Sequence, residues 1–540
     1  TKMIKNNQTK YIFVLGGVMS GLGKGIAAAS IGYLLKQAGV RVTILKLDPY
    51  LNVDPGTMNP YQHGEVFVLD DGSETDLDLG HYERFIDVNM TKNNNATAGQ
   101  IFSKVLEKER KGEYLGETVQ VIPHVTDEIK RRILEVNAQN EYDVIICEVG
   151  GTVGDIESLP FMESIRQLSL QVGYHNHMLV HVTLLPFVKA SGELKSKPTQ
   201  HSVMKLREIG LSPDMILCRS ELPIEQSVRD KIALFCNVPP SHVIEGRDVS
   251  SIYEVPLAIY KQKAGRLIKD RLKIKKTPQL GTLKDFIKNY KNPKYEVTIA
   301  MCGKYTELPD SYKSVMEAFV HAGVENNAKV NIKWIQTEKI KNSKDVKNVF
   351  SNVNGVLILP GFGSRGSEGK IKIVKYSREQ MVPFLGICLG LQCAIIEFAR
   401  NACKMRGANS TEFNAQTKYP VIDLMESQRA IKIKGGTMRL GAYDCQIKTG
   451  TRTYAAFRKK KISERHRHRY EVNNKYKKIL EKNGLIFSGV NQALNVVETI
   501  EVKNHPWFVA SQFHPELKSR INRAHPLFRE FIKAAVKNRP

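Results

Sequence analysis

A glycine-rich stretch at 16–25 has the residue types that bind a phosphate group. It reads GGVMSGLGKG and lies between an apolar run at 11–16 and a helix-like run at 26–37. Glycines let backbone N–H groups face an anion, a helix start carries partial positive charge, and Lys24 adds a full one. Gly25 stands where the common phosphate loop has the Ser or Thr that binds magnesium. The stretch predicts a phosphate site, with a plain glycine-rich turn as the alternative.

If no Ser or Thr holds the metal, carboxylates must do so, because magnesium prefers oxygen ligands. Two regions offer them: the acidic loop ETDLDLG at 74–80, and Glu148 at the end of an apolar run at 144–148. A solvated turn is the alternative reading of the acidic loop. A solvated turn is a weaker alternative for Glu148, which ends a run that we expect to be a buried strand. Burying an unpaired charge there would be costly, so a metal partner is favoured. The sequence therefore predicts a magnesium site beside the phosphate loop.

Cys388 is a candidate nucleophile. It lies in the frame GICLG at 386–390, after a short apolar run at 384–387 and before a helix-like run at 391–400. Small flanking residues permit the sharp turn of a nucleophile elbow, and the start of a helix favours the thiolate. Core packing is the alternative for Cys388 and is the interpretation we assign to Cys393.

A nucleophilic cysteine requires a base and a group that orients the base. The run at 507–513 is typical of a strand, and it is followed by His514-Pro515-Glu516. A spacing of two places both side chains on one side of an extended segment. A plain His-Pro turn is the alternative. The three residue types together predict a Cys388, His514 and Glu516 catalytic set.

The elements that position these residues follow an α/β pattern. We predict two domains, each a wound, mainly parallel sheet. Candidate strands lie at 11–16, 42–47, 144–148, 178–184, 215–218, 297–301, 356–359, 384–387 and 507–513. The predicted ranges are a flexible leader at 1–10, a first domain at 11–268, a lysine-rich linker at 269–294 and a second domain at 295–540. Ligands bind beyond the carboxyl ends of parallel strands, where the candidate residues lie.

Composition excludes several classes of protein. With 540 residues, 42% apolar and 25% charged, the chain is longer than one small module and is not disordered. Its eight cysteines never form Cys-x-x-Cys, which argues against a disulfide scaffold or zinc ribbon and predicts a reducing, cytoplasmic location. No apolar run reaches the length of a membrane-spanning helix. We predict neither membrane nor nucleic-acid partners: the net charge of +25 could attract nucleic acid, but a lysine-rich bias is favoured because no nucleic-acid-binding motif accompanies it.

Three long strings resemble CTP synthases: KLDPYLNVDPGTMNPYQHGEVFVLDDGSETDLDLGHYERF at 46–85, EVGGTVGDIESLPF at 148–161 and SKPTQHSV at 196–203. The resemblance runs from about residue 11 to the C-terminus. It implies a dethiobiotin-synthetase-like P-loop amidoligase domain followed by a class I glutamine amidotransferase domain. It also implies a ligase of pyrimidine nucleotide biosynthesis that aminates UTP to CTP with ATP. Ammonia would come from glutamine at the Cys-His-Glu site, and UTP would react through a 4-phosphorylated intermediate.

The resemblance implies a role for each matching position. The ATP-binding residues would be Gly21, Leu22, Gly23, Lys24, Gly25, Ile26, Lys46, Asp78, Arg247, Asp248 and Val249. Those for UTP or CTP would be Ser20, Asp155, Ile156, Glu157, Lys195, Ser196, Lys197, Pro198, Thr199, Gln200 and Lys231. Those for glutamine would be Gly361, Leu389, Gly390, Leu391, Gln392, Glu412 and Arg469. The magnesium ligands would be Asp78 and Glu148, and the catalytic residues Cys388, His514 and Glu516.

The resemblance further implies regulation and assembly. ATP would be a cosubstrate with Mg²⁺, GTP an allosteric activator and CTP a feedback inhibitor. The enzyme would be a homotetramer, and some members of the family form filaments.

One stretch departs from the family pattern. CTP synthases usually carry Pro-Gly-Gly-Phe-Gly where this chain has LPGFG at 359–363, called the oxyanion loop below. Proline has no N–H and cannot adopt positive φ, so Pro360 cannot replace a glycine donor. The N–H groups of Leu389 and Gly361 could still form the oxyanion hole. We predict a working glutaminase of reduced efficiency.

Two other functions share part of this pattern. A cobyrinic or cobyric acid amide synthase has a similar ATP loop and Cys-His-Glu set, but the pyrimidine-nucleotide segment at 195–200 argues for UTP. A deviant-Walker ATPase that polymerises or partitions DNA would fit the loop and the charge. It would leave the glutaminase motif unexplained.

Overall fold

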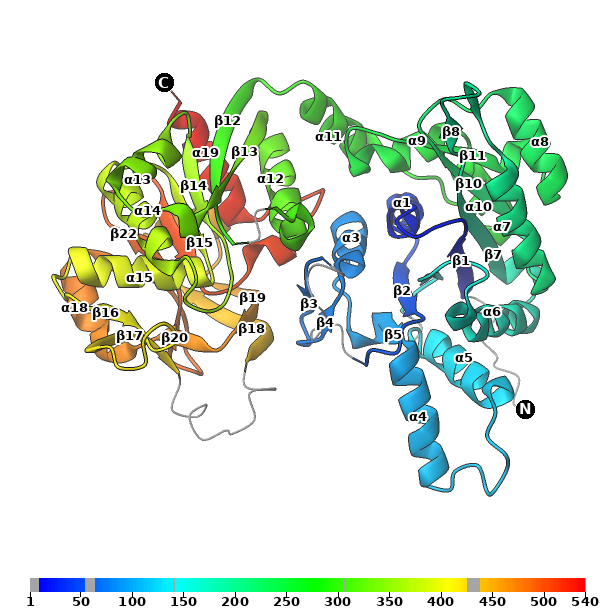
Figure 1. The fold of residues 1–540 in the computed structure, drawn as a ribbon, viewed down its shortest axis with the longest axis horizontal. Helices are drawn as coiled ribbons and strands as arrows, with labels where there is room; N and C mark the ends of the chain where they lie inside the picture. Colours follow the sequence, from blue (N-terminus) through cyan, green and yellow to red (C-terminus); the bar gives the residue numbers. More distant parts are fainter. Residues whose placement is uncertain (1–8, 54–63, 139–140, 305–306, 425–437, 540) are drawn as a thin grey trace. The chain divides into compact units, whose positions relative to one another are not determined.

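The computed structural model describes residues 9–53, 64–138, 141–304, 307–424 and 438–539 (Figure 1). Its contacts divide the chain into two compact units. Unit 1 comprises residues 1–57 and 78–287, and unit 2 comprises residues 58–77 and 288–540. The short segment 58–77 is thus assigned to unit 2, although the segments before and after it in the sequence are assigned to unit 1.

Unit 1 is built on a seven-stranded sheet in the order β11-β10-β7-β1-β6-β2-β5. Every neighbouring pair in it is parallel. The strands are β1 (Lys10–Gly16), β2 (Val42–Asp48), β5 (Asn95–Thr97), β6 (Val144–Val149), β7 (His177–Leu184), β10 (Met215–Ser220) and β11 (Val243–Arg247). The central strand β1 is apolar almost throughout and buried, as expected for a parallel sheet covered on both faces.

Helices connect and cover this sheet. They are α1 (Lys24–Gln37), α3 (Leu77–Ile86), α4 (Ala98–Arg110), α5 (Thr126–Glu135), α6 (Leu159–Val172), α7 (Lys197–Glu208), α8 (Gln226–Cys236), α9 (Val255–Lys261), α10 (Ala264–Leu272) and α11 (Gly281–Lys291). A small hairpin, β8 (Phe187–Val188) and β9 (Glu193–Leu194), precedes α7. α11 and the end of α10 fall within the lysine-rich range 269–294, so that range is partly helical.

Unit 2 has a nine-stranded sheet in the order β13-β12-β14-β15-β23-β22-β21-β18-β19. The pairings from β13 to β23 are parallel, and those from β23 to β19 are antiparallel. The strands are β12 (Tyr295–Gly303), β13 (Ala328–Gln336), β14 (Gly355–Ile358), β15 (Phe384–Ile387), β18 (Arg439–Ile447), β19 (Lys461–His468), β21 (Leu485–Asn491), β22 (Val496–Val502) and β23 (Phe508–Ser511). The parallel part carries the second α/β pattern that the sequence predicts.

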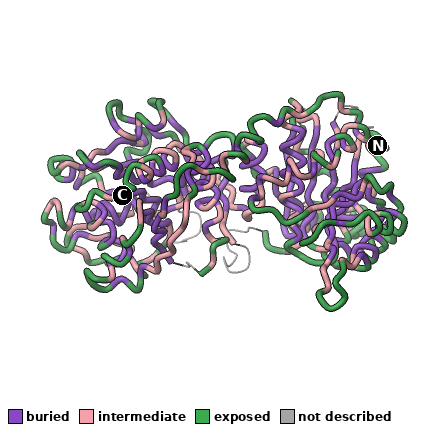
Figure 2. The backbone as a smooth tube through the Cα atoms, turned by 90° about the horizontal axis from the view of Figure 1, so that it is seen from above, coloured by how far each residue is buried: buried purple, intermediate pink, exposed green. Residues whose placement is uncertain are grey.

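The helices of unit 2 are α12 (Lys313–Glu325), α13 (Ser343–Phe350), α14 (Ser367–Glu379), α15 (Leu389–Asn401), α17 (Arg452–Phe457), α18 (Lys477–Lys482) and α19 (Pro526–Lys537). A three-stranded sheet contains β16 (Ala408–Ser410), β17 (Tyr419–Leu424) and β20 (Tyr470–Val472). The antiparallel hairpin β3 (Phe67–Val68) and β4 (Glu74–Thr75) completes the unit. Within each unit, buried residues follow the sheet and exposed residues follow the outer helices and loops (Figure 2).

The α/β class, the two-domain organisation and the nine predicted strands are confirmed. Residues 1–8 of the predicted leader at 1–10 lie outside the described residues, and the end of that range is not a flexible leader, because Thr9 is buried and Lys10 begins β1. None of the helices in the described part of the chain combines the length and the apolar character that crossing a membrane requires.

Candidate active site

Cys388 lies at a sharp turn between β15 and α15. Its φ of 53° and ψ of −100° are unusual for a residue with a side chain, and such strain is typical of a nucleophile elbow. The flanking glycines have no room for a Cβ. A Cβ at Gly386 would lie 2.9 Å from the Gly390 carbonyl carbon, and one at Gly390 would lie 2.6 Å from the Ile358 oxygen. The turn therefore depends on both glycines of the 386–390 frame.

His514 and Glu516 follow β23 and are both buried. The ring Nδ1 of His514 lies 2.7 Å from Glu516 Oε1, which orients the imidazole. Burial disfavours the charged ring, but the charge and hydrogen bond of Glu516, together with the nearby Cys388, outweigh it and raise the pKa of His514 to about 10. A protonated His514 would stabilise a thiolate at Cys388.

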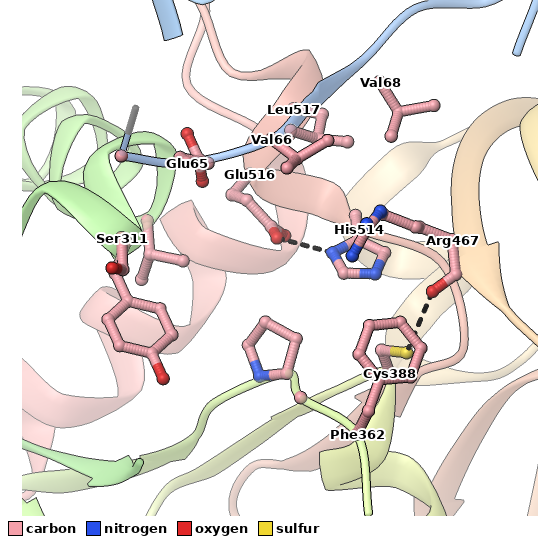
Figure 3. A pocket seen from close by; sticks show the side chains of 15 residues that line it. Glu65, Val66, Val68, Ser311, Phe362, Cys388, Arg467, His514, Glu516 and Leu517 are labelled. Atoms are coloured by element: carbon pink, nitrogen blue, oxygen red, sulfur yellow. Dashed lines mark hydrogen bonds and ion pairs between the residues drawn. The ribbon is translucent and has the colours of Figure 1, made fainter. Parts of the chain in front are cut away.

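A pocket in unit 2 contains all three residues (Figure 3). Its wall includes part of the oxyanion loop and a segment that precedes β3 in the sequence. The lining residues are Gly64, Glu65, Val66, Val68, Ser311, Tyr312, Val315, Pro360, Gly361, Phe362, Cys388, Arg467, His514, Glu516 and Leu517. The Cys388 thiol also donates to the Arg467 carbonyl at 3.9 Å. Nucleophile, base and orienting carboxylate thus share one pocket.

The β3–β4 hairpin is bound to β19 by two ion pairs. Arg465 Nε donates to Asp70 Oδ1 at 2.5 Å, and Arg467 Nε donates to Glu74 Oε1 at 2.6 Å. Gly441 has a φ of 90°, and a Cβ there would lie 2.6 Å from the backbone nitrogen of Gly72. The hairpin therefore packs closely on the strands beside the pocket. The sequence analysis missed this contact, because almost 400 residues separate the two segments.

The oxyanion loop is held by a predicted glutamine-binding residue. The Gly363 N–H donates to Glu412 Oε1 at 2.6 Å, while burial raises the pKa of the Glu412 carboxyl. The charge of Arg469 acts on the same carboxyl, so these two residues lie near each other. Gln392 Nε2 donates to the Tyr470 carbonyl at 3.1 Å. Of the predicted glutamine-binding residues, only Gly361 lines the described pocket itself.

In unit 1, the phosphate loop connects β1 to α1, and Lys24 begins the helix. The Lys24 side chain is buried, and its Nζ donates to the Gly151 carbonyl at 2.5 Å. A Cβ at Gly16 would lie 2.6 Å from Lys24 Cδ, so the lysine lies back over the start of the loop. Burial lowers the pKa of Lys24, and the charge of Lys46 adds to this shift, while Glu148 and Asp78 oppose it.

Asp78 and Glu148 meet beside this loop, with Lys46 between them. Lys46 Nζ donates to Asp78 Oδ2, and it lies 3.0 Å from Glu148 Oε1. Burial disfavours the charged amine, but Asp78 and Glu148 outweigh it and raise the pKa of Lys46 well above its usual value. Tyr82 also donates to Glu148. The cluster is a compact group of charges in which Lys46 and Glu148 are buried and Asp78 is partly exposed.

The departure at Gly25 has a steric explanation. A Cβ there would lie 2.7 Å from Asp78 Oδ1 and 3.4 Å from Glu148 Oε2. The absence of a side chain leaves space for the two carboxylates next to the loop. Among the described residues, no group of three or more His, Cys, Asp or Glu side chains is placed to hold a metal ion. Two carboxylates completed by phosphate oxygens and water are nevertheless a set that suits Mg²⁺.

The predicted nucleotide segment 195–200 lies at the start of α7. Thr199 Oγ1 donates to the Leu184 carbonyl at 3.1 Å, which fixes the first turn of the helix. One turn later, a Cβ at Gly17 would lie 1.5 Å from Ser202 Oγ. α7 therefore packs directly against the phosphate loop, and its first turn lies close to that site.

Three further predicted positions, Asp248, Lys195 and Lys231, lie near these elements. Arg219, which the sequence analysis missed, donates to Asp248 Oδ1 at 3.0 Å and to the Gly21 carbonyl at 3.1 Å, so it links the end of β11 to the phosphate loop. The hydrogen bond and charge of Lys195 lower the pKa of Glu193, with a smaller effect from Lys231. Lys195 and Lys231 thus lie near one point on the surface.

The segment 155–157 follows β6 in an exposed turn. Asp155 Oδ2 accepts the Thr152 N–H at 3.1 Å, and the Ile156 side chain is exposed. Ser20, at the outer edge of the phosphate loop, is exposed as well. These nucleotide contacts stay predictions.

Two family models match this chain. The model described as CTP synthase N-terminus matches residues 10–274, and that described as Glutamine amidotransferase class-I matches residues 307–534. A CTP synthase of Caldanaerobacter subterraneus subsp. tengcongensis is 57% identical over 98% of each chain. One of Clostridium acetobutylicum is 55% identical over 98% of this chain and 99% of its own. The chain belongs to the CTP synthase family.

A solved structure titled as the glutaminase domain of Trypanosoma brucei CTPS with bound acivicin is also similar. It is 32% identical, covers 45% of this chain and 94% of its own, and superposes with a TM-score of 0.43. The family assignment rests on the two family models and the full-length relatives. For the CTP synthase family, two separate sites in one chain are expected, and unit 1 and unit 2 each contain one candidate.

Proposed function

We propose that this chain is a glutamine-hydrolysing CTP synthase that aminates UTP to CTP with ATP. One observation carries the proposal: the elbow cysteine and its His514–Glu516 pair share a pocket in unit 2. A CTP synthase N-terminal sequence with an acidic cluster beside its phosphate loop accompanies them in the same chain. An isolated ATPase would have no use for the cysteine site.

In unit 2, the sulfur of Cys388 would attack the carboxamide carbon of glutamine. His514 would pass a proton to the departing nitrogen, which leaves as ammonia, and a thioester remains. Water, activated by the same ring, would then release glutamate and restore the thiol. Glu516 would hold the ring orientation and balance its charge, as the 2.7 Å contact allows. The N–H groups of Leu389 and Gly361 would stabilise the oxyanion.

In unit 1, ATP would transfer its γ-phosphoryl group to O4 of UTP. Ammonia would then displace that phosphate at C4 and give CTP. Lys24 would bind phosphate oxygens, and Lys46 would balance charge as the phosphoryl group moves. Asp78 and Glu148 would hold Mg²⁺, which neutralises phosphate charge when it is bound. The first turn of α7 would position the phosphates of UTP, and Arg219 would hold Asp248 near the adenine.

The resemblance to CTP synthases extends the proposal to regulation. GTP would act as activator, CTP would inhibit at the pyrimidine-nucleotide site, and the protein would work as a cytoplasmic homotetramer. Support comes from the near full-length match to CTP synthases.

The decisive experiment measures CTP formation from UTP and Mg²⁺-ATP with glutamine or with ammonium. The intact protein is expected to use both nitrogen sources. Cys388→Ala should lose glutamine-dependent turnover by at least about 10³-fold and keep ammonium-dependent turnover, because only the first requires the nucleophile.

A matched control is Cys393→Ala, which alters a buried cysteine on the following helix and should leave both rates of the same order as wild type. If neither nitrogen source yields CTP with the intact protein, the assignment of UTP is wrong. Activity with ammonium alone in the intact protein would locate the defect in the oxyanion loop.

A further inference from the structure

Lys370 on α14 is a buried lysine that has no role in the reaction steps proposed for either site. Its side chain is entirely inaccessible to solvent. Its Nζ donates to the carbonyl of Leu359, the first residue of the oxyanion loop, at 3.2 Å. Within the described part of the chain, Lys370 forms no ion pair with a carboxylate. A buried amine without such a partner is costly, so its presence beside a catalytic loop requires an explanation.

The surroundings of Lys370 point toward the nucleophile. Burial lowers the pKa of its amine to about 8; the charge of Lys304 adds to this shift, and negative charge at Cys393, Cys302 and Cys388 opposes it. The amine therefore lies within electrostatic range of Cys388. In a buried setting of low dielectric, such a charge acts strongly on a nearby anion.

Gly361 lies close both to Lys370 and to Leu389, the first residue of α15 after the nucleophile. A Cβ at Gly361 would be 4.0 Å from Lys370 Nζ and 3.6 Å from Leu389 Cδ2. Leu389 and Gly361 are the two residues expected to donate to the oxyanion. Lys370 thus lies behind the part of the oxyanion loop whose orientation is most important for the reaction.

A second lysine holds the other end of the loop. Lys304 Nζ donates to the Phe362 carbonyl at 2.5 Å and to the Gly363 carbonyl at 3.3 Å. The Gly363 N–H points to the opposite side, where Glu412 accepts it, because C=O and N–H of a trans peptide are antiparallel. The loop is therefore fixed at both ends by ammonium groups on its carbonyl oxygens, with Gly361 between them.

We propose that Lys370 is a positioning residue of the glutaminase reaction, which fixes the oxyanion loop so that the Gly361 N–H faces the oxyanion. This role rests on the glutaminase activity proposed above. Pro360 has no N–H with which to anchor the loop, so the bonds to its carbonyl oxygens add to those that the Leu359 and Gly363 N–H groups make at its two ends. A donor that is already oriented costs no reorganisation when the oxyanion forms.

The test compares Lys370→Met with Lys372→Met. Lys372 lies two residues further along α14 and also donates to a backbone carbonyl, that of Lys341 at 2.6 Å, but it is exposed. For Lys370→Met we expect the kcat of glutamate release from glutamine to fall by about 10- to 100-fold, with KM within about threefold. Ammonium-dependent CTP formation should stay within about twofold of wild type. Lys372→Met should leave both reactions within about twofold.

Lys370→Gln distinguishes positioning from general packing. Its amide keeps a donor for the Leu359 carbonyl, so it should recover at least about a third of the lost kcat if the hydrogen bond is what orients the loop. It also covers the case in which the methionine variant does not fold. Thermal unfolding of each variant provides the check on folding.

Three results would overturn the role of Lys370. The first is an unchanged kcat for glutamate release in Lys370→Met. The second is an equal loss of turnover with glutamine and with ammonium in that variant. The third is a loss of kcat in Lys370→Gln equal to that in Lys370→Met. The CTP synthase assignment fails separately, if the intact protein releases glutamate but makes no CTP. Glutamate release still tests Lys370 in that case. An intact protein that releases no glutamate would overturn the role of Lys370 together with the glutaminase step on which it rests, and CTP formation with ammonium would still test the synthase assignment.

Discussion

The two candidate sites are held in different ways. In unit 1, the reactive side chains hold one another, since Lys46 lies between Asp78 and Glu148. In unit 2, the backbone takes part in holding the catalytic residues: the backbone N–H of His514 donates to the Arg465 carbonyl at 2.8 Å, and the Cys388 thiol donates to that of Arg467, while Glu516 orients the ring. A site for triphosphates requires charged side chains that balance the charge of the phosphates. A site that attacks the uncharged carboxamide of glutamine requires a fixed geometry.

This difference determines how each site should fail. Removing one charge from a buried cluster leaves the remaining charges unbalanced, so the whole site is affected. Removing one side chain from a site held by the backbone leaves the frame in place and affects a single step. The predictions below test this contrast, from the largest expected effect to the smallest.

Lys46→Met should have the largest effect. Without the amine, Asp78 and Glu148 repel each other, and the charge that accompanies phosphoryl transfer is lost. We expect CTP formation to fall by about 10²- to 10³-fold with either nitrogen source. Lys104→Met, which removes one partner of an exposed pair, is the control and should have little effect. A loss confined to glutamine would contradict the contrast between the units.

Glu516→Gln should affect glutamine alone. The Glu516 charge helps to keep the pKa of His514 raised to about 10, so the variant ring loses its proton at lower pH. We expect glutamine-dependent turnover to fall by about 10- to 100-fold at neutral pH. The deficit should grow between pH 7 and 9, since the proton is lost there in the variant and kept in the wild type. A deficit that is constant over this pH range would argue against this electrostatic role.

Asp70→Asn should weaken the hairpin beside the pocket. Burial raises the pKa of the Asp70 carboxyl, but Arg465 and Lys518 outweigh it, so the pKa is lowered in the folded protein. The carboxylate therefore stabilises the fold above about pH 4, and this contribution is lost as the pH falls through the folded pKa.

At neutral pH, the variant should lose about 1–2 kcal/mol of unfolding free energy and about threefold in glutamine-dependent turnover. The difference in stability from wild type should shrink in acid. Asp71→Asn, at the exposed neighbouring position, is the control. Equal stability of Asp70→Asn and wild type at neutral pH would show that the ion pair with Arg465 contributes nothing.

Pro360→Gly should have the smallest effect. It restores a backbone N–H at the departure from the family pattern, and we expect glutamine-dependent turnover to rise by at most about threefold. Ammonium-dependent turnover is the internal control. Wild-type turnover that is already equal with glutamine and ammonium would contradict any handicap from Pro360.

Local motifs could be predicted from the sequence because the geometry they require is local. The frame at 386–390 contains its own glycines, and the phosphate loop at 16–25 contains its own lysine. The Asp71-Gly72 pair between short β-prone runs is a hairpin signal, but nothing in it indicates which strand the hairpin contacts. In the sequence, nothing distinguishes Lys370, which is buried, from the exposed lysines of the same helix.

By itself, the sequence determined the two α/β patterns, the order of the reactive motifs and the family to which the chain belongs. Only the tertiary structure decided that Lys46 lies between Asp78 and Glu148, that the β3–β4 hairpin packs on β19, and that Lys370 is buried behind the oxyanion loop. The physical reason is that the strength of the electrostatic interactions of a charged side chain depends on its burial and on partners that are distant in sequence. Both are fixed only when the strands pair.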